Sequence, residues 1–215
     1  MHYLLHPTLQ ATFDSSAVYD DRGRLMPLDS NVSMDEALLL CSAVRHIKPT
    51  RSVEIGLAKG ISTLAILGAI DANGFGHHTV CDPFQSDYGN AGVEMVRRAG
   101  LTYCWEFHRM YAEEIVPSLD PVQFAFVDAS HLFDLTLMEF VLIDKKLEIG
   151  GVVGSHDFWM SSLQKLFRFI KNNRSYEVWY PPGCQPYISP IQKGWKNSVR
   201  NLARQLPFQQ RVFST

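Results

Sequence analysis

Acidic side chains stand at the ends of most short apolar runs in this sequence that have the composition of β-strands. Glu54 lies in the first run, Asp82 and Asp128 end the second and fourth, and the fifth leads into His156 and Asp157. In open α/β sheets ligands bind at the carboxyl ends of the strands, so these residues are expected to meet at one edge. Carboxylates beside an imidazole could bind a cation, position a hydroxyl group or move a proton. The sequence therefore predicts a ligand site built from strand ends.

The segment VEIGLAKGIST joins the first of these carboxylates to a turn of small residues. Gly56, Ala58 and Gly60 allow a tight turn and a close approach of a ligand to the backbone. A helical pattern that begins near Ser62 adds free amide donors. The dinucleotide site of an NAD-linked oxidoreductase also has glycines followed by an acidic residue, but its spacing is G-x-G-x-x-G. Glu54 would also lie close to an anionic pyrophosphate, so a cationic ligand suits this turn better.

Strand-like and helix-like segments alternate after Pro49 at a spacing typical of a parallel sheet with helices on both faces. A helix is expected before them, from a capping box of Ser33 and Glu36 to the stop at Pro49. We predict an α/β fold with a mostly parallel sheet and an antiparallel last strand, because YEVWY, PPGCQ and PYIS suggest a hairpin. Residues 1–31 show no sustained period and are expected to form an irregular N-terminal cap on a single domain at residues 32–215. The expected strands lie at residues 52–55, 78–82, 103–107, 124–128, 151–155 and 176–180, and the expected helices lie near 62–72, 90–99, 112–118, 134–147 and 161–173.

Composition narrows the class of partners. The formal net charge of -2 gives no electrostatic argument for binding nucleic acid or an anionic membrane. No window approaches the roughly 18 apolar residues that a membrane span requires. The four cysteines are scattered and show no zinc-like spacing, which fits a reducing compartment. We therefore expect a cytoplasmic protein that acts on small molecules.

Four motifs carry a family resemblance, and they occur in order across residues 36–158. VEIGLAKGIST resembles the first motif of class I S-adenosylmethionine-dependent methyltransferases, which is E-x-G-x-x-x-G-x-S-T in the O-methyltransferase branch. CDPFQ resembles the end of their second strand, and RMYAEEIVPSL the segment before the fourth. FVDASHLFD followed by LEIGGVVGSHD resembles the small-molecule enzymes grouped with cephalosporin hydroxylase-like and macrolide-sugar O-methyltransferases. The resemblance implies the Rossmann-like sheet of that class.

The resemblance also implies a cofactor site for S-adenosyl-L-methionine. Asp82 would accept hydrogen bonds from two ribose hydroxyls, and Tyr111, Ala112 and Glu113 would line the adenine. The remaining cofactor-binding positions implied are Glu54, Gly56, Ala58, Gly60, Ser62 and Asp128.

On the acceptor side, the resemblance implies a catalytic His131 as general base beside Asp128. Metal-dependent relatives hold a divalent cation with carboxylates, which match Asp128 and Asp157 here, whereas His156 stands where they have a third carboxylate. His156 could be a third metal ligand, could orient Asp157, or could contact the cofactor. Oxygen ligands suit Mg²⁺ and imidazole favours later metals, so Mg²⁺, Mn²⁺, Fe²⁺, Zn²⁺ and no metal all stay open.

The expected function is O-methylation of a small-molecule hydroxyl on a sugar, phenolic or secondary metabolite. One alternative is a methyltransferase-like protein that binds S-adenosylmethionine without turnover, and another is an NAD-linked oxidoreductase. The N-terminal residues 1–31 could cover the site or pair with another subunit, so a homo-oligomer is possible.

Overall fold

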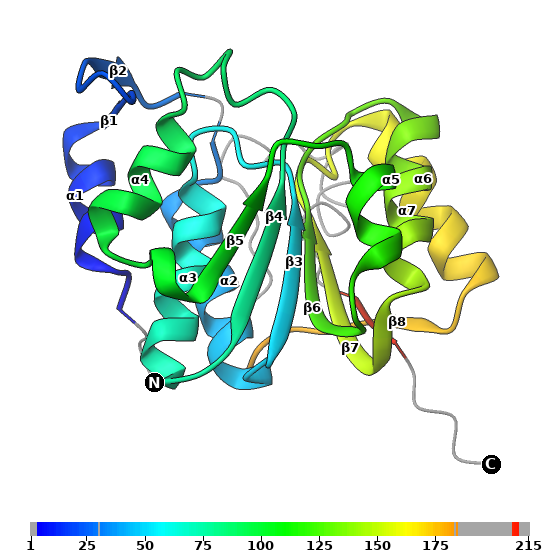
Figure 1. Ribbon diagram of the computed structural model, residues 1–215. Helices are drawn as coiled ribbons and strands as arrows, with labels where there is room; N and C mark the ends of the chain where they lie inside the picture. Colours follow the sequence, from blue (N-terminus) through cyan, green and yellow to red (C-terminus); the bar gives the residue numbers. More distant parts are fainter. Residues whose placement is uncertain (1–3, 30, 183, 185–207, 211–215) are drawn as a thin grey trace, which may run out of the picture.

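The computed structural model describes residues 4–29, 31–182, 184 and 208–210 (Figure 1). Its main sheet has seven strands in the order β5-β4-β3-β6-β7-β9-β8. Neighbouring strands from β5 to β7 pair in parallel, while β9 is antiparallel to both β7 and β8. The predicted α/β sheet with an antiparallel last strand is therefore confirmed. The strands are β3 (Arg51–Ile55), β4 (His77–Cys81), β5 (Trp105–His108), β6 (Val122–Val127), β7 (Leu147–Ser155), β8 (Tyr176–Val178) and β9 (Phe208–Gln210).

Strand order reverses at β3, the first strand of the main sheet along the chain. The chain moves from β3 outward to β4 and β5, then returns to place β6 on the other side of β3. Loops after β3 and β6 therefore diverge from neighbouring strand ends, and this topology leaves a crevice for a ligand.

Helices cover both faces of this sheet (Figure 1). Each face has its own apolar core, as expected for parallel strands that are buried on both sides. One face carries α1 (Pro7–Ser15), α2 (Met34–Ile47), α3 (Ile61–Asn73) and α4 (Ala91–Ala99), and the other carries α5 (Ala112–Ile115), α6 (Phe133–Asp144) and α7 (Ser161–Asn173), with short 3-10 turns at Thr102–Cys104 and Val116–Ser118.

Helix α2 begins and ends where its sequence predicts. The Glu36 backbone N–H donates to Ser33 Oγ at 3.3 Å, and the Ser33 backbone N–H donates to Glu36 Oε2 at 2.6 Å, which completes the capping box. Lys48 adopts a left-handed conformation just before Pro49 and ends the helix. This local chemistry sets the position of Glu36, which also contributes to the site described below.

The expectation of an irregular segment over residues 1–31 was wrong for its middle part. Besides α1, this segment forms a hairpin of β1 (Ala17–Tyr19) and β2 (Leu25–Pro27). Asp20 holds the connecting turn, because its carboxylate accepts from the backbone N–H groups of Arg22 and Arg24 at 3.0 and 2.7 Å. The turn-forming residues of this segment thus join two short strands. A strand of three residues is too short to show a detectable alternation of apolar and polar residues in the sequence.

The hairpin region is attached to the glycine turn through Lys59. The Lys59 side chain does not face solvent, since it is only 7% exposed. Its ammonium donates to the Pro27 carbonyl oxygen at 2.7 Å and pairs with Asp29.

At the other end of the chain, β8 pairs with β9. The PYIS segment that we expected to form the second hairpin strand lies outside the described residues. In the described part of the chain, no helix has the length and apolar character needed to cross a membrane.

Candidate functional site

A cavity of about 550 Å³ lies at the carboxyl ends of the parallel strands. This volume is within the range of small-molecule sites, roughly 300–1,000 Å³. Its wall combines the ends of β3 and β4 with the loops that follow β3, β4 and β6, the start of α5 and one face of α6. The lining includes Gly56, Ala58, Asp82, Phe84, Tyr88, Tyr111, Ala112, Glu113, Asp128, His131, Leu135, Met138 and Glu139.

The glycine turn after β3 forms one wall, and its shape requires small residues. Gly56 has a φ of +97°, and a Cβ there would lie 2.2 Å from the Asp128 carbonyl oxygen. Ala58 has a φ of +43°, in the left-handed region that non-glycine residues rarely adopt. Gly60, with a φ of +80°, is the N-cap residue of α3 and packs against Gly92. Of the three small residues, Gly56 and Ala58 line the cavity, whereas Gly60 shapes the turn behind it.

Asp82 ties this turn to the end of β4. Its Oδ2 accepts from the backbone N–H groups of Leu57 and Ala58 at 3.0 and 2.9 Å, and from Gln85 Nε2 at 3.0 Å. Oδ1 accepts from the Phe84 N–H at 2.7 Å. Because Oδ2 already has three donors, only Oδ1 keeps acceptor capacity for a ligand. Asp82 lines the cavity as predicted, but in this arrangement it cannot accept two ribose hydroxyls through separate oxygens.

Glu54 lies behind the turn instead of in the cavity, and this corrects its predicted direct role. Its carboxylate is fully buried and accepts from Ser62 Oγ at 2.5 Å and Thr63 Oγ1 at 2.7 Å. His78 Nε2 lies 3.0 Å from Glu54 Oε2, and its Nδ1 lies 2.9 Å from Ser52 Oγ. Ser62 is likewise an internal partner and does not line the cavity. A buried charge needs such partners, so these residues fasten the start of α3 to β3.

The residues expected to line an adenine form the opposite part of the cavity. Tyr111, Ala112 and Glu113 all lie in its wall. The Tyr111 ring meets Phe84 edge to face, with centroids 5.9 Å apart. Both rings are half exposed, so they offer apolar surface to a planar ligand.

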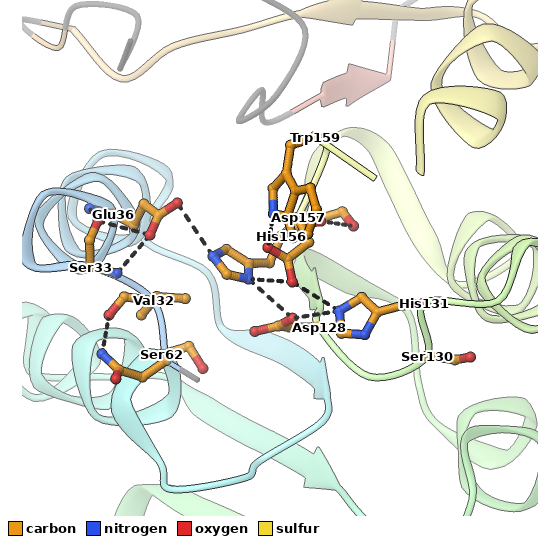
Figure 2. A network of polar contacts seen from close by, with 12 residues as sticks. Val32, Ser33, Glu36, Ser62, Asp128, Ser130, His131, His156, Asp157 and Trp159 are labelled. Atoms are coloured by element: carbon orange, nitrogen blue, oxygen red, sulfur yellow. Dashed lines mark hydrogen bonds and ion pairs between the residues drawn. The ribbon is translucent and has the colours of Figure 1, made fainter. Parts of the chain in front are cut away.

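On the β6–β7 side, three predicted chemical residues converge (Figure 2). His131 Nε2 lies 3.0 Å from Asp157 Oδ2 and 4.0 Å from Asp128 Oδ1. One ligand atom from each of these residues lies within 4.8 Å of the others, as a metal site requires. Asp157 has a left-handed φ of +56°, and Trp159 Nε1 donates to its Oδ1 at 2.6 Å. Burial raises the pKa of Asp157, but hydrogen bonds from His156 and Trp159 outweigh burial and lower this pKa below its usual range.

His156 is not one of these three residues, but it lies close to three carboxylates. Its Nδ1 lies 3.4 Å from Asp128 Oδ1 and 3.5 Å from Asp157 Oδ2, while its Nε2 lies 3.4 Å from Glu36 Oε1 (Figure 2). Burial alone would lower the pKa of His156, but these three carboxylates outweigh burial and raise it to about 12. By the distances between ligand atoms, the candidate metal group consists of Asp128, His131 and Asp157, and the expected ligand His156 lies beside this group.

Two residues of this region were missed by sequence reasoning. Glu36 was predicted only as a capping residue, yet its second oxygen reaches His156 from α2. Glu139 was not singled out, although a lone carboxylate within the apolar run LMEFVLI is a detectable signal. Its side chain is buried in the cavity wall.

Comparisons with known proteins agree with this fold. Residues 53–158 match a methyltransferase domain family. The chain is 27% identical over 171 residues to tapetum-specific methyltransferase 1 of Arabidopsis thaliana, covering 75% of this chain and 66% of that protein. It is 25% identical over 143 residues to a flavonoid 3',5'-methyltransferase of Vitis vinifera, covering 63% of this chain and 59% of that one. The chain therefore spans about two thirds or less of the length of these relatives.

A solved structure with the same fold is the O-methyltransferase TomG from Streptomyces achromogenes, which is involved in tomaymycin synthesis and was determined in complex with S-adenosylmethionine. The TM-score is 0.66 at 16% identity, over 96% of this chain and 88% of that chain. The strand order and the glycine turn agree with the matched domain. Residues 53–158 therefore form a methyltransferase domain on a Rossmann-like sheet.

Proposed function

We propose that this protein transfers the methyl group of S-adenosylmethionine to a hydroxyl oxygen of a small molecule. The observation that carries the proposal is the placement of His131 and Asp128 in the wall of the same cavity as the glycine turn. A cofactor on the turn and an acceptor at His131 would then share one enclosed space. The names of two similar solved structures, the O-methyltransferase TomG and an O-methyltransferase from Bacillus cereus, support the choice of oxygen as the acceptor atom.

The residues present fit the cofactor. The cavity is large enough for a small ligand, and the turn brings backbone close to it because Gly56 has no side chain. Phe84, Tyr111 and Ala112 supply apolar surface for the base. When bound, S-adenosylmethionine supplies a methyl group on a sulfonium, which is transferred by in-line displacement.

The protein's own contribution is to position the acceptor and remove its proton. His131 is 43% exposed at the side chain, so an acceptor hydroxyl can reach its imidazole. Nε2 lies 3.0 Å from Asp157 Oδ2, and this carboxylate would stabilise the imidazolium formed when His131 takes the proton. Asp128 is positioned to accept a hydrogen bond from the same hydroxyl.

A divalent cation is the second way in which these residues could activate the acceptor. Asp128, His131 and Asp157 would hold it, and their mixed oxygen and nitrogen donors suit Mn²⁺, Fe²⁺ or Zn²⁺ as well as Mg²⁺. A bound cation would lower the pKa of a coordinated hydroxyl. In the base mode His131 Nε2 donates to Asp157 and Nδ1 takes the proton, whereas in the cation mode the imidazole binds the metal, so the two modes predict different effects of metal.

The proposed acceptors are phenolic, sugar or other secondary-metabolite hydroxyls. The name of the flavonoid enzyme supports the phenolic class. We place the activity in the cytoplasm, which the free thiols of Cys41, Cys81, Cys104 and Cys184 support. Pairing with a second copy of the chain stays a prediction.

The experiment is a methyl-transfer assay with isotope-labelled S-adenosylmethionine on metal-stripped protein. A panel of catechols, flavonoids and sugars is tested alone and with Mg²⁺, Mn²⁺ or Zn²⁺. We expect transfer that falls at least about 100-fold in His131→Gln, the lower end of the contribution of a general base. The exposed His77→Gln at the amino end of β4 is the matched control and should keep full activity.

The outcomes separate the proposals. Transfer without metal supports His131 as the base, whereas transfer that requires a metal and is lost in Asp157→Asn supports the cation mode. Binding of S-adenosylhomocysteine with no transfer to any acceptor would favour a binding protein without turnover. Binding of NAD in place of S-adenosylhomocysteine would overturn the proposal.

A further inference from the structure

Glu139 carries an unexplained polar atom in the cavity wall. This residue lies on α6, is 6% exposed and lines the cavity. The backbone N–H of Ser130 donates to its carboxyl group. The other oxygen, Oε2, is buried, and no hydrogen-bond partner for it exists among the described residues. Buried polar atoms are almost always paired, so an orphan beside a cavity points to a ligand.

The acceptor chemistry does not account for Glu139. The ion-pair contacts within the acceptor group join Asp128, His131, His156 and Asp157 to one another. The charge of Glu139 acts on the Cys81 thiol at the end of β4. The carboxylate of Glu113 on α5 acts on Glu139 in turn, and more strongly than that of Asp128. These neighbours belong to the part of the cavity where Tyr111 and Phe84 also lie.

The surroundings of Glu139 suit a flat heterocycle with a polar edge. Leu135 and Met138 of α6 line the same cavity as the edge-to-face pair of Phe84 and Tyr111. Apolar and aromatic side chains bind the faces of a planar ring. Such a ring still needs a hydrogen-bond partner for its polar edge, and the Glu139 carboxyl is a buried group of that kind in this wall.

We propose that Glu139 binds the Watson–Crick edge of the cofactor's adenine and so selects adenine over other bases. This inference rests on the proposed use of S-adenosylmethionine. The adenine edge presents an amino donor next to a ring-nitrogen acceptor. A neutral carboxyl presents an acceptor and a donor in the complementary order, as the amide of Asn or Gln does toward adenine. The Ser130 N–H already donates to one carboxyl oxygen and favours that oxygen as an acceptor, which leaves the proton on Oε2 and sets the order of donor and acceptor.

The electrostatic environment favours the neutral form. Burial, followed by the carboxylates of Glu113 and Asp128, raises the pKa of Glu139 to about 7, against the lowering effect of the hydrogen bond from the Ser130 N–H. The Cys81 thiol also faces this region, but burial and nearby carboxylates raise its pKa to about 12, so it adds no charge near neutral pH. Glu139 can therefore carry the proton that adenine recognition requires.

The test is calorimetric titration of the full chain with S-adenosylhomocysteine and with S-inosylhomocysteine. Hypoxanthine reverses the donor and acceptor order of adenine, so the ratio of the two affinities reports base selection. Glu139→Gln keeps both a donor and an acceptor and should bind S-adenosylhomocysteine within about 3-fold of the wild type. Glu139→Leu removes both and should weaken binding at least about 10-fold, the effect of one lost bidentate contact. Its preference for adenine should fall by a similar factor. Asp134→Asn, exposed on the same helix, is the control and should change neither value.

The pH dependence of S-adenosylhomocysteine affinity is a second measurement, and it would not change if Glu139 had only a structural role. Wild-type affinity should fall between about pH 6 and about pH 8.5, as Glu139 loses its proton, while Glu139→Gln should be flat. A folded Glu139→Leu protein that keeps the wild-type preference for adenine would overturn the assignment and leave the proposed function intact. If the wild type binds no S-adenosylhomocysteine, the proposed function fails and this inference fails with it.

Discussion

The buried carboxylate of Glu54 offers the sharpest test of how this site is built. Three groups contact it: the hydroxyls of Ser62 and Thr63 at 2.5 and 2.7 Å, and His78 Nε2 at 3.0 Å. A Glu54→Gln substitution keeps the shape but removes the charge. Each hydrogen bond to a charged group is worth about 1.5–3 kcal/mol and each neutral one about 0.5–1.5, so three weakened bonds predict a loss of about 3–4 kcal/mol. For a chain of this size that corresponds to a fall in Tm of roughly 6–15 °C.

The assay is chemical and thermal unfolding together with S-adenosylhomocysteine titration of the folded fraction. Thr63→Val should lower the free energy of unfolding by about one third as much as Glu54→Gln does. The double substitution should lower it by less than the sum of the two single losses, because the two residues share a hydrogen bond. Glu106→Gln, on the exposed side of β5, is the matched control and should leave Tm within about 2 °C. A Glu54→Gln protein with wild-type Tm but no S-adenosylhomocysteine binding would refute the internal role and restore Glu54 as a direct cofactor ligand.

Three further changes test the turn, the acceptor side and the hairpin. Gly56→Ala should weaken S-adenosylhomocysteine binding at least about 10-fold, because its Cβ would lie 2.2 Å from a backbone carbonyl oxygen, whereas Gly74→Ala, with a similar φ of +78° and open space, should cost only about 1 kcal/mol of stability. The folded-state pKa of His156 is raised from 6.5 to about 12, so its contribution to stability is complete below pH 6.5 and is lost as pH rises toward 12. The difference in unfolding free energy between wild type and His156→Gln should therefore shrink from about pH 7 to about pH 9, by up to ~1.4 kcal/mol per unit, and a difference that grows would contradict the assignment. Lys59→Met should speed hydrogen exchange in the hairpin at 17–27, measured by mass spectrometry, and unchanged exchange would show that the Lys59 contacts do not hold it.

Local chemistry explains the parts of the fold that the sequence predicts well. The capping box of Ser33 and Glu36 and the stop at Pro49 define α2 within a residue or two. The alternation of apolar runs and helical patterns predicts the parallel strands, because both depend on residues close together in the chain. The expectation that strand-end residues meet also holds for Asp128 and Asp157, since parallel strands bring their carboxyl ends to one edge.

The errors concern which partner each polar group finds, and that depends on contacts distant in sequence. Glu54 has the position of a cofactor ligand, but its partners lie on α3 and on β4, 8 to 24 residues away. Lys59 sits in an open turn, yet a hairpin 32 residues earlier covers it. No periodicity encodes such pairings, because they are set only when the sheet assembles.

Glu36 takes part both in a local interaction, the capping box of α2, and in a contact with a residue far away in the sequence. Its Oε2 accepts from the Ser33 N–H within the capping box, and its Oε1 lies 3.4 Å from His156, which follows β7. The second contact gives His156 a carboxylate on the side away from Asp128 and Asp157, so the imidazolium is held between α2 and the acceptor residues (Figure 2). The three carboxylates raise the pKa of His156 and so favour its protonated form, and a positive charge there would reduce the negative charge that a metal ion would otherwise balance. The start of α2 therefore contacts the proposed acceptor residues through His156, although it precedes the first strand of the main sheet.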